Sequence, residues 1–195
     1  MSGWDEAVLV LRAGGVVAVP TDTVWGLVTL PNNAAGVERI YAIKGRPQTM
    51  ELPLLAPEAD ALAGLVQFPA EAMSLAAAHW PGALTLIVRC VAPRTVMVIP
   101  QRGETLAVRV PSHPGLQTLM AQTGPLASTS ANVHGRPAAT SADEVRAQLG
   151  NTVDLVVDVP ESGSGGGRAS TIVDCTDSPL RVIRQGDVVV RIDRA

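Results

Sequence analysis

Val16-Val-Ala-Val-Pro-Thr-Asp-Thr-Val-Trp-Gly-Leu27 is the stretch on which the expected fold class depends. Its first four residues form an apolar run that Pro20 closes, and this pattern predicts a short buried strand. A second strand is predicted over Trp25–Leu30. The helical spacing of apolar residues predicts one helix over Trp4–Arg12 and another over 33–43. Strands that lie between helices in this way are typical of an α/β domain.

The rest of the chain continues this mixture of helices and strands. Further helices are predicted over Pro57–Leu65, Pro69–Trp80, His113–Gln122 and Ser141–Leu149, the last with a capping box between Ser141 and Glu144. Further strands are predicted over Leu52–Leu55, Leu84–Val88, Leu106–Val110, Leu126–Ala127, Val153–Val157, Ser170–Asp174, Leu180–Ile183 and Val188–Ile192. Pro53 should move the first of these strands toward a sheet edge. Because the elements do not alternate strictly, we expect a three-layer α/β fold with a mixed sheet, formed by residues 1–195 as a single domain.

Composition and charge disfavour several classes of protein. Hydrophobic residues make up 47% of the chain and charged residues 17%, which suffices for a core that needs neither a disulfide nor a metal. Cys90 and Cys175 follow no CxxC pattern and are expected to be buried thiols. Asp5 and Glu6 stand where a signal peptide needs positive charge, and no apolar run reaches the ~18 residues of a membrane helix, so we expect a soluble, cytoplasmic protein. The net charge of −3 disfavours a general nucleic-acid coat.

The familiar catalytic signatures are absent from the sequence. His79, His113 and His134 have no metal-ligand spacing, and there is no P-loop, no GxGxxG fingerprint and no GxSxG elbow. No tightly bound, protein-ligated metal is expected. A function must therefore be sought among polar residues that ordinary folding leaves unexplained.

Three short polar segments stand out, and each has two interpretations. The Thr and Asp residues of Pro20–Leu27 could face a ligand crevice at the end of a strand, or they could form a turn with their own backbone. The cations of Lys44-Gly-Arg-Pro47 could bind phosphate oxygens, or they could complement a helix dipole. Ser128-Thr-Ser-Ala-Asn132 could bind a buried polar ligand or form a polar turn.

Other polar residues accompany these segments. Thr105 and Arg109 lie at even spacing, hence on one face of a strand, where the arginine requires an anion. Ser170-Thr171 and Arg184 add a pair of hydroxyls and another cation. The Gly-rich segment that includes Gly163–Arg168 is expected to be a flexible loop, and its role as a lid is left open.

Seven motifs follow one another along the chain, from about Gly14 to Gly186. They are PTDTVWGL (20–27), KGRP (44–47), WPGALTLI (80–87), LAVRVPSHP (106–114), STSAN (128–132), STIVD (170–174) and IRQG (183–186). In this order they resemble the YrdC-like family, which includes the threonylcarbamoyl-AMP synthases. No single motif is decisive, and their order over nearly the whole chain carries the resemblance.

The resemblance implies a twisted mixed sheet with a basic concave face, and a reaction. L-Threonine, bicarbonate and ATP would give threonylcarbamoyl-AMP and pyrophosphate, with Mg²⁺ on the triphosphate. Downstream tRNA threonylcarbamoyltransferase proteins would collect the product, a weak RNA contact is left open, and no membrane is involved.

On matching positions, the resemblance also implies two groups of site residues. The threonine ligands would be Thr23, Arg109, Ser128 and Ser170. The residues around ATP would be Lys44, Arg46, Thr105, Ser130, Asn132, Ala138 and Arg184. Catalysis would depend on Lys44, Arg46, Ser130 and Asn132, because preorganised cations and polar groups stabilise charge that moves to pyrophosphate.

The sequence departs from the family pattern beside KGRP. Met50 and Glu51 stand where the family usually has a polar side chain and then an apolar residue, which puts nucleotide affinity in doubt. Trp25 replaces a frequent tyrosine, and Arg168 could supply a replacement cation.

Two rival functions remain at this stage. One is a YrdC-like paralogue with other carbamoyl or adenylate chemistry, such as the carbamoyl-adenylating domain of hydrogenase maturation proteins. The other is an RNA-binding module, which the acidic pI near 5.6 and the 3% of aromatic residues disfavour.

Overall fold

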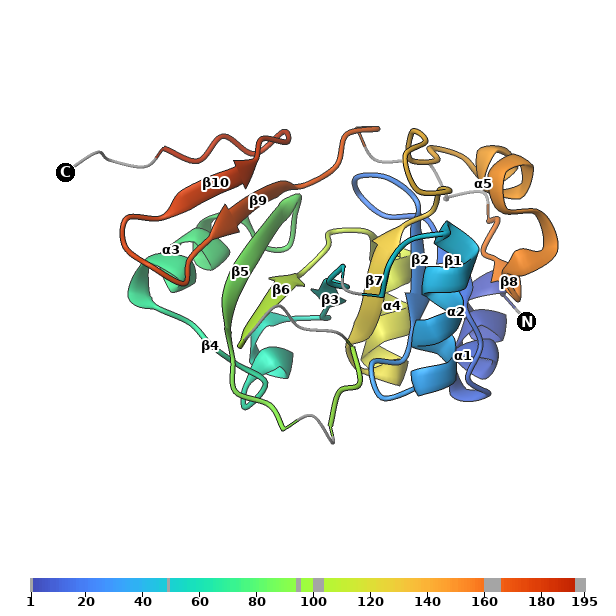
Figure 1. The fold of residues 1–195 in the computed structure, drawn as a ribbon, viewed down its shortest axis with the longest axis horizontal. Helices are drawn as coiled ribbons and strands as arrows, with labels where there is room; N and C mark the ends of the chain where they lie inside the picture. The colour runs from blue at the N-terminus through green and yellow to red at the C-terminus, as the bar shows by residue number, and fades with distance from the viewer. Residues whose placement is uncertain (1, 49, 94–95, 100–103, 160–165, 192–195) are drawn as a thin grey trace.

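The computed structural model describes residues 2–48, 50–93, 96–99, 104–159 and 166–191, and its described strands all belong to one sheet. Along the sheet the strands are β10 (Arg181–Arg184), β9 (Thr171–Asp174), β5 (Leu84–Cys90), β6 (Thr105–Arg109), β3 (Leu54–Leu55), β7 (Leu126–Ser130), β2 (Gly26–Thr29), β1 (Val17–Val19) and β8 (Leu155–Val156), while β4 (Val66–Gln67) pairs with β5 outside this path (Figure 1). The pairs β1/β8, β3/β6 and β5/β9 are parallel and the other pairs of described strands are antiparallel, which confirms the mixed sheet.

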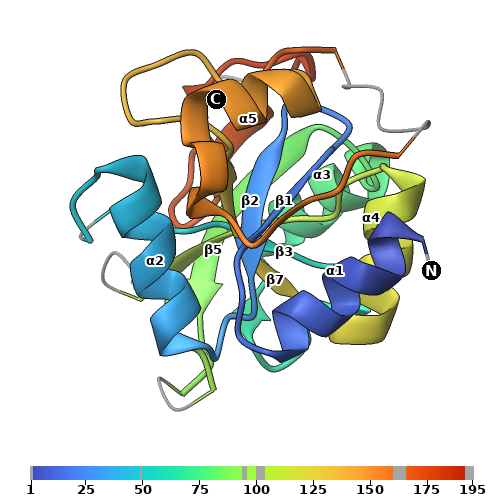
Figure 2. The same ribbon diagram turned by 90° about the vertical axis from the view of Figure 1, so that its right-hand side faces the viewer.

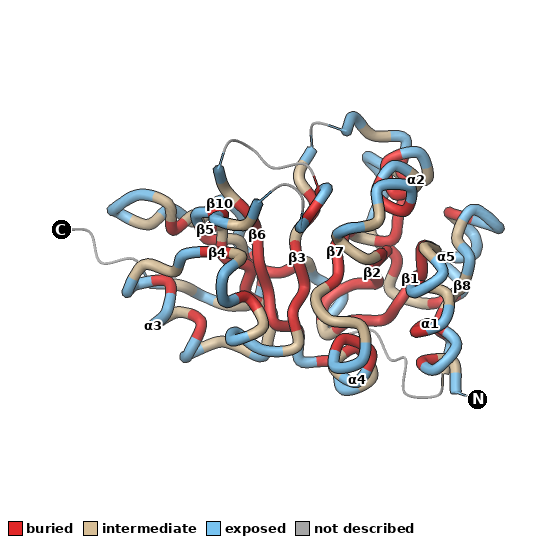
Figure 3. The backbone as a smooth tube through the Cα atoms, turned by 90° about the horizontal axis from the view of Figure 1, so that it is seen from below, coloured by how far each residue is buried: buried red, intermediate tan, exposed pale blue. Residues whose placement is uncertain are grey.

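Helices cover both faces of the sheet around β1 and β2. In Figure 2, α1 (Gly3–Arg12) and α4 (Pro114–Thr123) lie on one side, and α2 (Ala34–Lys44) lies on the other with α5 (Ala142–Leu149) above it. Successive residues of β1 show why: Val17 and Val19 pack with α1 and α4, whereas Val16 and Ala18 belong to the second core with α2 and α5. The buried strands between outward-facing helix surfaces are visible in Figure 3. The expected three-layer fold is confirmed here; the extent of the single domain stays a prediction.

The helix ends follow local capping chemistry. Ser2 and Asp5 form a reciprocal capping box at α1, which the sequence analysis did not identify. At α5, the Ser141 hydroxyl accepts from the Glu144 N–H as predicted, but the Glu144 carboxylate accepts from the N–H of Thr140 instead of that of Ser141. Half of the predicted capping box therefore forms.

Three predicted elements were wrong. β3 lies in the middle of the sheet, between β6 and β7, rather than at an edge. Pro53 stands just before this strand and is joined to β7 through its carbonyl, which accepts from the N–H of Ser128 at 2.8 Å. The N–H that proline lacks is therefore not needed for this pairing. The expected helix over 57–65 is only a 3₁₀ turn, η1 (Ala59–Leu62), followed by β4.

The last predicted strand does not form, and side chains bond to one of its carbonyls. Positions 188–191 of the expected strand over 188–192 are not in the sheet. The carbonyl of Val188 accepts from the hydroxyl of Thr171 at 2.6 Å and from the amide of Gln185 at 2.8 Å. These bonds hold the segment against β9 without a ladder. A further 3₁₀ turn, η2 (Gly150–Thr152), follows α5, and α3 (Ala70–His79) packs against β5.

Candidate active site

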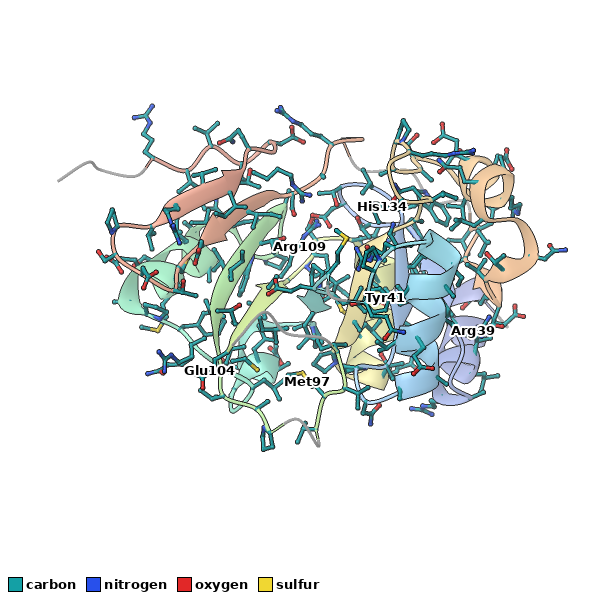
Figure 4. All side chains as sticks on the ribbon, viewed as in Figure 1. Arg39, Tyr41, Met97, Glu104, Arg109 and His134 are labelled. Atoms are coloured by element: carbon teal, nitrogen blue, oxygen red, sulfur yellow. The ribbon has the colours of Figure 1, made fainter. Side chains whose placement is uncertain are left out.

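One face of the sheet, from β2 and β7 across to β9 and β10, opens into a cavity of about 550 Å³. Leu84 and Leu86 of β5 point into the core that α3 covers, whereas Thr85 and Ile87 line the cavity. The same alternation on β6 brings Ala107 and Arg109 to the cavity. In Figure 4, Arg109 lies over the middle of the sheet, and Tyr41 lies to one side of it on α2.

Most of the predicted site residues line this cavity although they are far apart in sequence. Those that line it are Thr23, Arg46, Arg109, Ser128, Ser130, Asn132, Ala138, Ser170 and Arg184. Lys44 and Thr105 are not among the lining residues. Among the described lining residues, four arginines face one carboxylate, that of Glu51, so this face is basic.

Arg109 is held at one end of the cavity by three hydrogen bonds. Its side chain is buried, and it donates to the carbonyl of Gly82 at 2.9 Å, to the hydroxyl of Thr23 at 2.9 Å and to the carboxylate of Asp22 at 2.6 Å. Burial lowers the pKa of Arg109, and the charge of Asp22 opposes that shift. Asp22 is thus the anion that an inward-facing arginine requires.

Arg184 lies at the same end of the cavity. Its Nε donates to the carbonyl of Ser170 at 3.0 Å, and its Nη2 donates to the Ser170 hydroxyl at 3.2 Å. Partial burial is the main cause that lowers the pKa of Arg184, and the positive charge of Arg109 lowers it further. The two guanidinium groups are therefore close enough to repel one another. The Ser170 hydroxyl also lies 2.8 Å from that of Thr85.

Lys44 lies behind the part of the cavity wall formed by Ser130 and Asn132, and it holds these two residues in place. Its side chain is buried, and Nζ donates to the carbonyls of Ser130 and Asn132 at 2.6 and 2.9 Å and to Asn132 Oδ1 at 2.9 Å. These bonds use the three hydrogens of an ammonium group. Burial, followed by the charge of Arg46, lowers the pKa of Lys44 to about 8. Lys44 therefore fixes the turn that presents Ser130 and Asn132 to the cavity.

Arg46 belongs to the opposite end of the cavity from Arg109. Its guanidinium lies 5.1 Å from the centre of the Tyr41 ring, and its Nη2 donates to the carbonyl of Glu51 at 3.2 Å. The Tyr41 hydroxyl donates to the carbonyl of Met50, so one side chain orients both the cation and the segment after it. Burial lowers the pKa of Arg46. The residues that depart from the family pattern, Met50 and Glu51, both line the cavity.

Thr105 contacts the site indirectly. Its hydroxyl lies 3.4 Å from the carboxylate of Glu51, on the same face of β6 as Arg109. The described residues contain no group of three or more His, Cys, Asp or Glu side chains that could hold a metal ion.

Arg136 and Thr85 are polar lining residues to which the sequence analysis gave no role. Arg136 lies four residues after Asn132 and is exposed at the cavity, and its position in a basic loop beside the SAN motif was a usable signal. Thr85 is the one polar residue of the apolar run Leu84–Val88, and that was its signal.

The proposed lid can be followed only in part. Residues 160–165 lie outside the described part of the chain. The N–H of Gly167 donates to the carbonyl of Thr23 at 3.1 Å, which joins the end of this segment to the first polar motif. Arg168 pairs with Asp187 at 3.6 Å and does not line the cavity, so it supplies no replacement cation in this structure.

A family model described as "Telomere recombination" (Sua5_yciO_yrdC) matches residues 9–186. The chain belongs to the Sua5/YciO/YrdC family. A family member from Vibrio cholerae, named threonylcarbamoyl-AMP synthase, is 40% identical over 186 residues, which are 93% of this chain and 96% of that protein.

Solved structures of the Sua5/YciO/YrdC family have the same fold. The crystal structure of P. abyssi Sua5 complexed with L-threonine has a TM-score of 0.85 and 34% identity, covering 94% of this chain and 54% of that one. This chain thus spans about half of that Sua5 chain. T. kodakarensis HypF has a TM-score of 0.77 over 93% of this chain and 24% of its own length, but its 16% identity shows a shared fold alone.

Proposed function

We propose that the protein is a threonylcarbamoyl-AMP synthase. It would join L-threonine, bicarbonate and ATP into threonylcarbamoyl-AMP, with release of pyrophosphate and one water. The observation that carries this proposal is one basic cavity, in which arginines from its two ends meet the hydroxyls of the PTDT, STSAN and ST motifs. The relatives with this name support the same activity.

The end of the cavity around Arg109 suits L-threonine. A carboxylate fits the guanidinium pair of Arg109 and Arg184, and the hydroxyls of Thr23, Ser128 and Ser170 suit the remaining polar atoms. Asp22 cancels one of the two positive charges, which leaves a net charge that matches a single carboxylate.

The opposite end suits the nucleotide. Arg46 and the Ser130–Asn132 turn face the cavity there, Ala138 offers backbone groups, and Lys44 acts by holding that turn. We assign Thr105 an indirect part through Glu51. Mg²⁺ would arrive on the triphosphate, because Glu51 is the only carboxylate among the described lining residues and makes no metal site alone.

The chemistry needs positioning more than a nucleophilic side chain. The threonine amine attacks the carbon of bicarbonate or CO₂, and an oxygen of the resulting carbamate then attacks the α-phosphorus, from which pyrophosphate leaves. Arg184, which the resemblance assigns to the nucleotide, bonds to Ser170 and lies beside Arg109, so we propose that it contacts both substrates where they meet. Fixed cations at this point stabilise the charge that develops on the leaving group.

The assay for this proposal follows pyrophosphate. The protein is incubated with ATP, Mg²⁺ and bicarbonate, together with L-threonine or L-serine. Release that depends on threonine supports the synthase. ATP turnover that ignores threonine would favour the paralogue, and absent turnover with salt-sensitive retention of RNA would favour the RNA-binding module.

Arg46→Ala should raise the KM for ATP by about tenfold or more, because a charge-assisted contact to phosphate is lost. The melting temperature should change little, because Arg46 is only half-buried and contacts one carbonyl and one ring face. Steady-state kinetics and thermal unfolding check both statements. A large loss of stability with an unchanged KM would make Arg46 a structural residue.

The setting of the protein is part of the proposal. None of the described helices is long and apolar enough to cross a membrane. We propose a cytoplasmic enzyme whose labile product passes to tRNA threonylcarbamoyltransferase proteins.

A further inference from the structure

Thr85 places a hydroxyl where packing alone would favour valine. It lies in the middle of the sheet on β5, is 3% exposed, and its neighbours along the strand are leucines. A buried hydroxyl destabilises a fold unless it is hydrogen-bonded, and valine has the same shape with a higher preference for strands. The partner of this hydroxyl is that of Ser170, at 2.8 Å.

Counting hydrogens shows that this pair is incomplete. Each hydroxyl has one hydrogen to donate and two lone pairs to accept. Arg184 donates to Ser170 Oγ, and one hydroxyl hydrogen is used between Thr85 and Ser170. Among the described residues no acceptor is present for the second hydroxyl hydrogen, although Ser170 is only 5% exposed.

The surplus hydrogen faces the cavity, because both side chains line it. If Thr85 donates to Ser170, the two acceptor positions of Ser170 are filled by Thr85 and Arg184, and its own hydrogen points to the cavity. If Ser170 donates instead, the hydrogen of Thr85 is the one left over. Either way the pair offers one O–H donor beside Arg184, and the group that suits such a donor is an anionic oxygen.

We propose that Thr85 is a positioning residue that orients the Ser170 hydroxyl as a donor to the carboxylate of L-threonine. In the arrangement that we propose, Thr85 donates to one acceptor position of Ser170 and Arg184 donates to the other, so the Ser170 hydrogen has a single direction. This inference rests on the proposed function and adds to it a residue that selects for the charged amino acid.

Thr85→Val tests the inference because it removes the hydroxyl and keeps the shape. The KM for L-threonine, and its Kd by calorimetry, should rise about tenfold, the size expected for a misdirected hydrogen bond to a charged group. The kcat at saturating threonine and the KM for ATP should stay within about twofold. Thr85→Ser retains the hydroxyl and should restore the wild-type KM. Thr85→Ala replaces Thr85→Val if the latter does not fold.

A double variant distinguishes positioning from packing. In a Ser170→Ala background, adding Thr85→Val should change the KM for threonine by less than about twofold, because Thr85 acts through Ser170. Thr29→Val is the matched control: Thr29 is a fully buried threonine on β2 whose hydroxyl donates to the Gly15 carbonyl away from the cavity. Its loss should lower stability without a change in KM.

Each outcome decides between defined alternatives. An unchanged KM in Thr85→Val, an equal rise in Thr85→Ser, or a full additional loss in the Ser170→Ala background would overturn the inference while leaving the proposed function intact. A parallel rise of both KM values with a falling melting temperature would assign Thr85 to packing and also overturn it. A wild-type protein without threonine-dependent turnover would remove the proposed function and this inference together.

Discussion

Arg109→Leu is expected to abolish measurable threonine-dependent pyrophosphate release and to lower the free energy of unfolding by roughly 3–5 kcal/mol. The activity is lost because the proposed carboxylate site loses its buried cation. The stability is lost because the Asp22 carboxylate, whose side chain is 13% exposed, loses the partner of its buried ion pair. Pyrophosphate release and urea unfolding measure the two effects separately.

A second substitution separates the two consequences. Asp22→Asn added to Arg109→Leu removes the unpaired charge, so at least half of the lost stability should return while the activity stays absent. Arg146→Leu is the control, because Arg146 forms its ion pairs with Asp143 and Asp158 at the surface and should leave both measurements unchanged. Full stability in Arg109→Leu alone would contradict a buried ion pair at this position.

Lys44→Met is expected to reduce kcat/KM for ATP by at least about a hundredfold and to lower the free energy of unfolding by about 3 kcal/mol. The variant leaves the carbonyls of Ser130 and Asn132 without their donor, and unsatisfied buried acceptors each destabilise by about 1–3 kcal/mol. The turn that presents Asn132 to the cavity then loses its anchor. Steady-state kinetics and urea unfolding check these values. Loss of activity without loss of stability would instead indicate direct contact between Lys44 and substrate.

The lowered pKa of Lys44 gives the same side chain a pH dependence. Folded Lys44 loses its proton near pH 8, whereas the unfolded side chain keeps it to about 10.5. Between these values the unfolded state binds more protons, so the contribution of Lys44 to stability rises with pH. The stability of the wild type relative to Lys44→Met should therefore increase from about pH 8 to 10.5.

Whereas the contribution of Lys44 to stability rises with pH, its contribution to ATP binding should fall. Loss of the Lys44 charge removes a positive charge from behind the wall at the nucleotide end, so the KM for ATP should rise above pH 8 in the wild type. Lys44→Met should lack this inflection, which separates it from titration of the substrates. Parallel pH profiles for both proteins would contradict the assignment.

The helices and strands near the N-terminus could be predicted, because they depend on residues that are close together in the sequence. Apolar periodicity predicts α1 and α2, and the apolar runs before Pro20 and after Thr23 predict β1 and β2, because burial of a helix stripe or a strand follows from spacing along the chain. Prediction failed where residues far away in the chain bond to the backbone of the segment. Pro53 predicted an edge strand, but in the folded chain the N–H of Ser128 bonds to the Pro53 carbonyl and the strand is central.

By itself, the sequence determined which residues have the chemistry for this cavity. Residue type and spacing alone show which cations and hydroxyls stand at the ends of strands and helices. Most of these residues line one cavity. Only the tertiary structure decided their roles. Asp22 neutralises Arg109 across 87 residues, and Lys44 anchors Asn132 across 88, while Thr85 meets Ser170 across 85. Hydrogen bonds act over about 3 Å, so such partners are decided by the packing of strands far apart in the chain and leave no local pattern to detect.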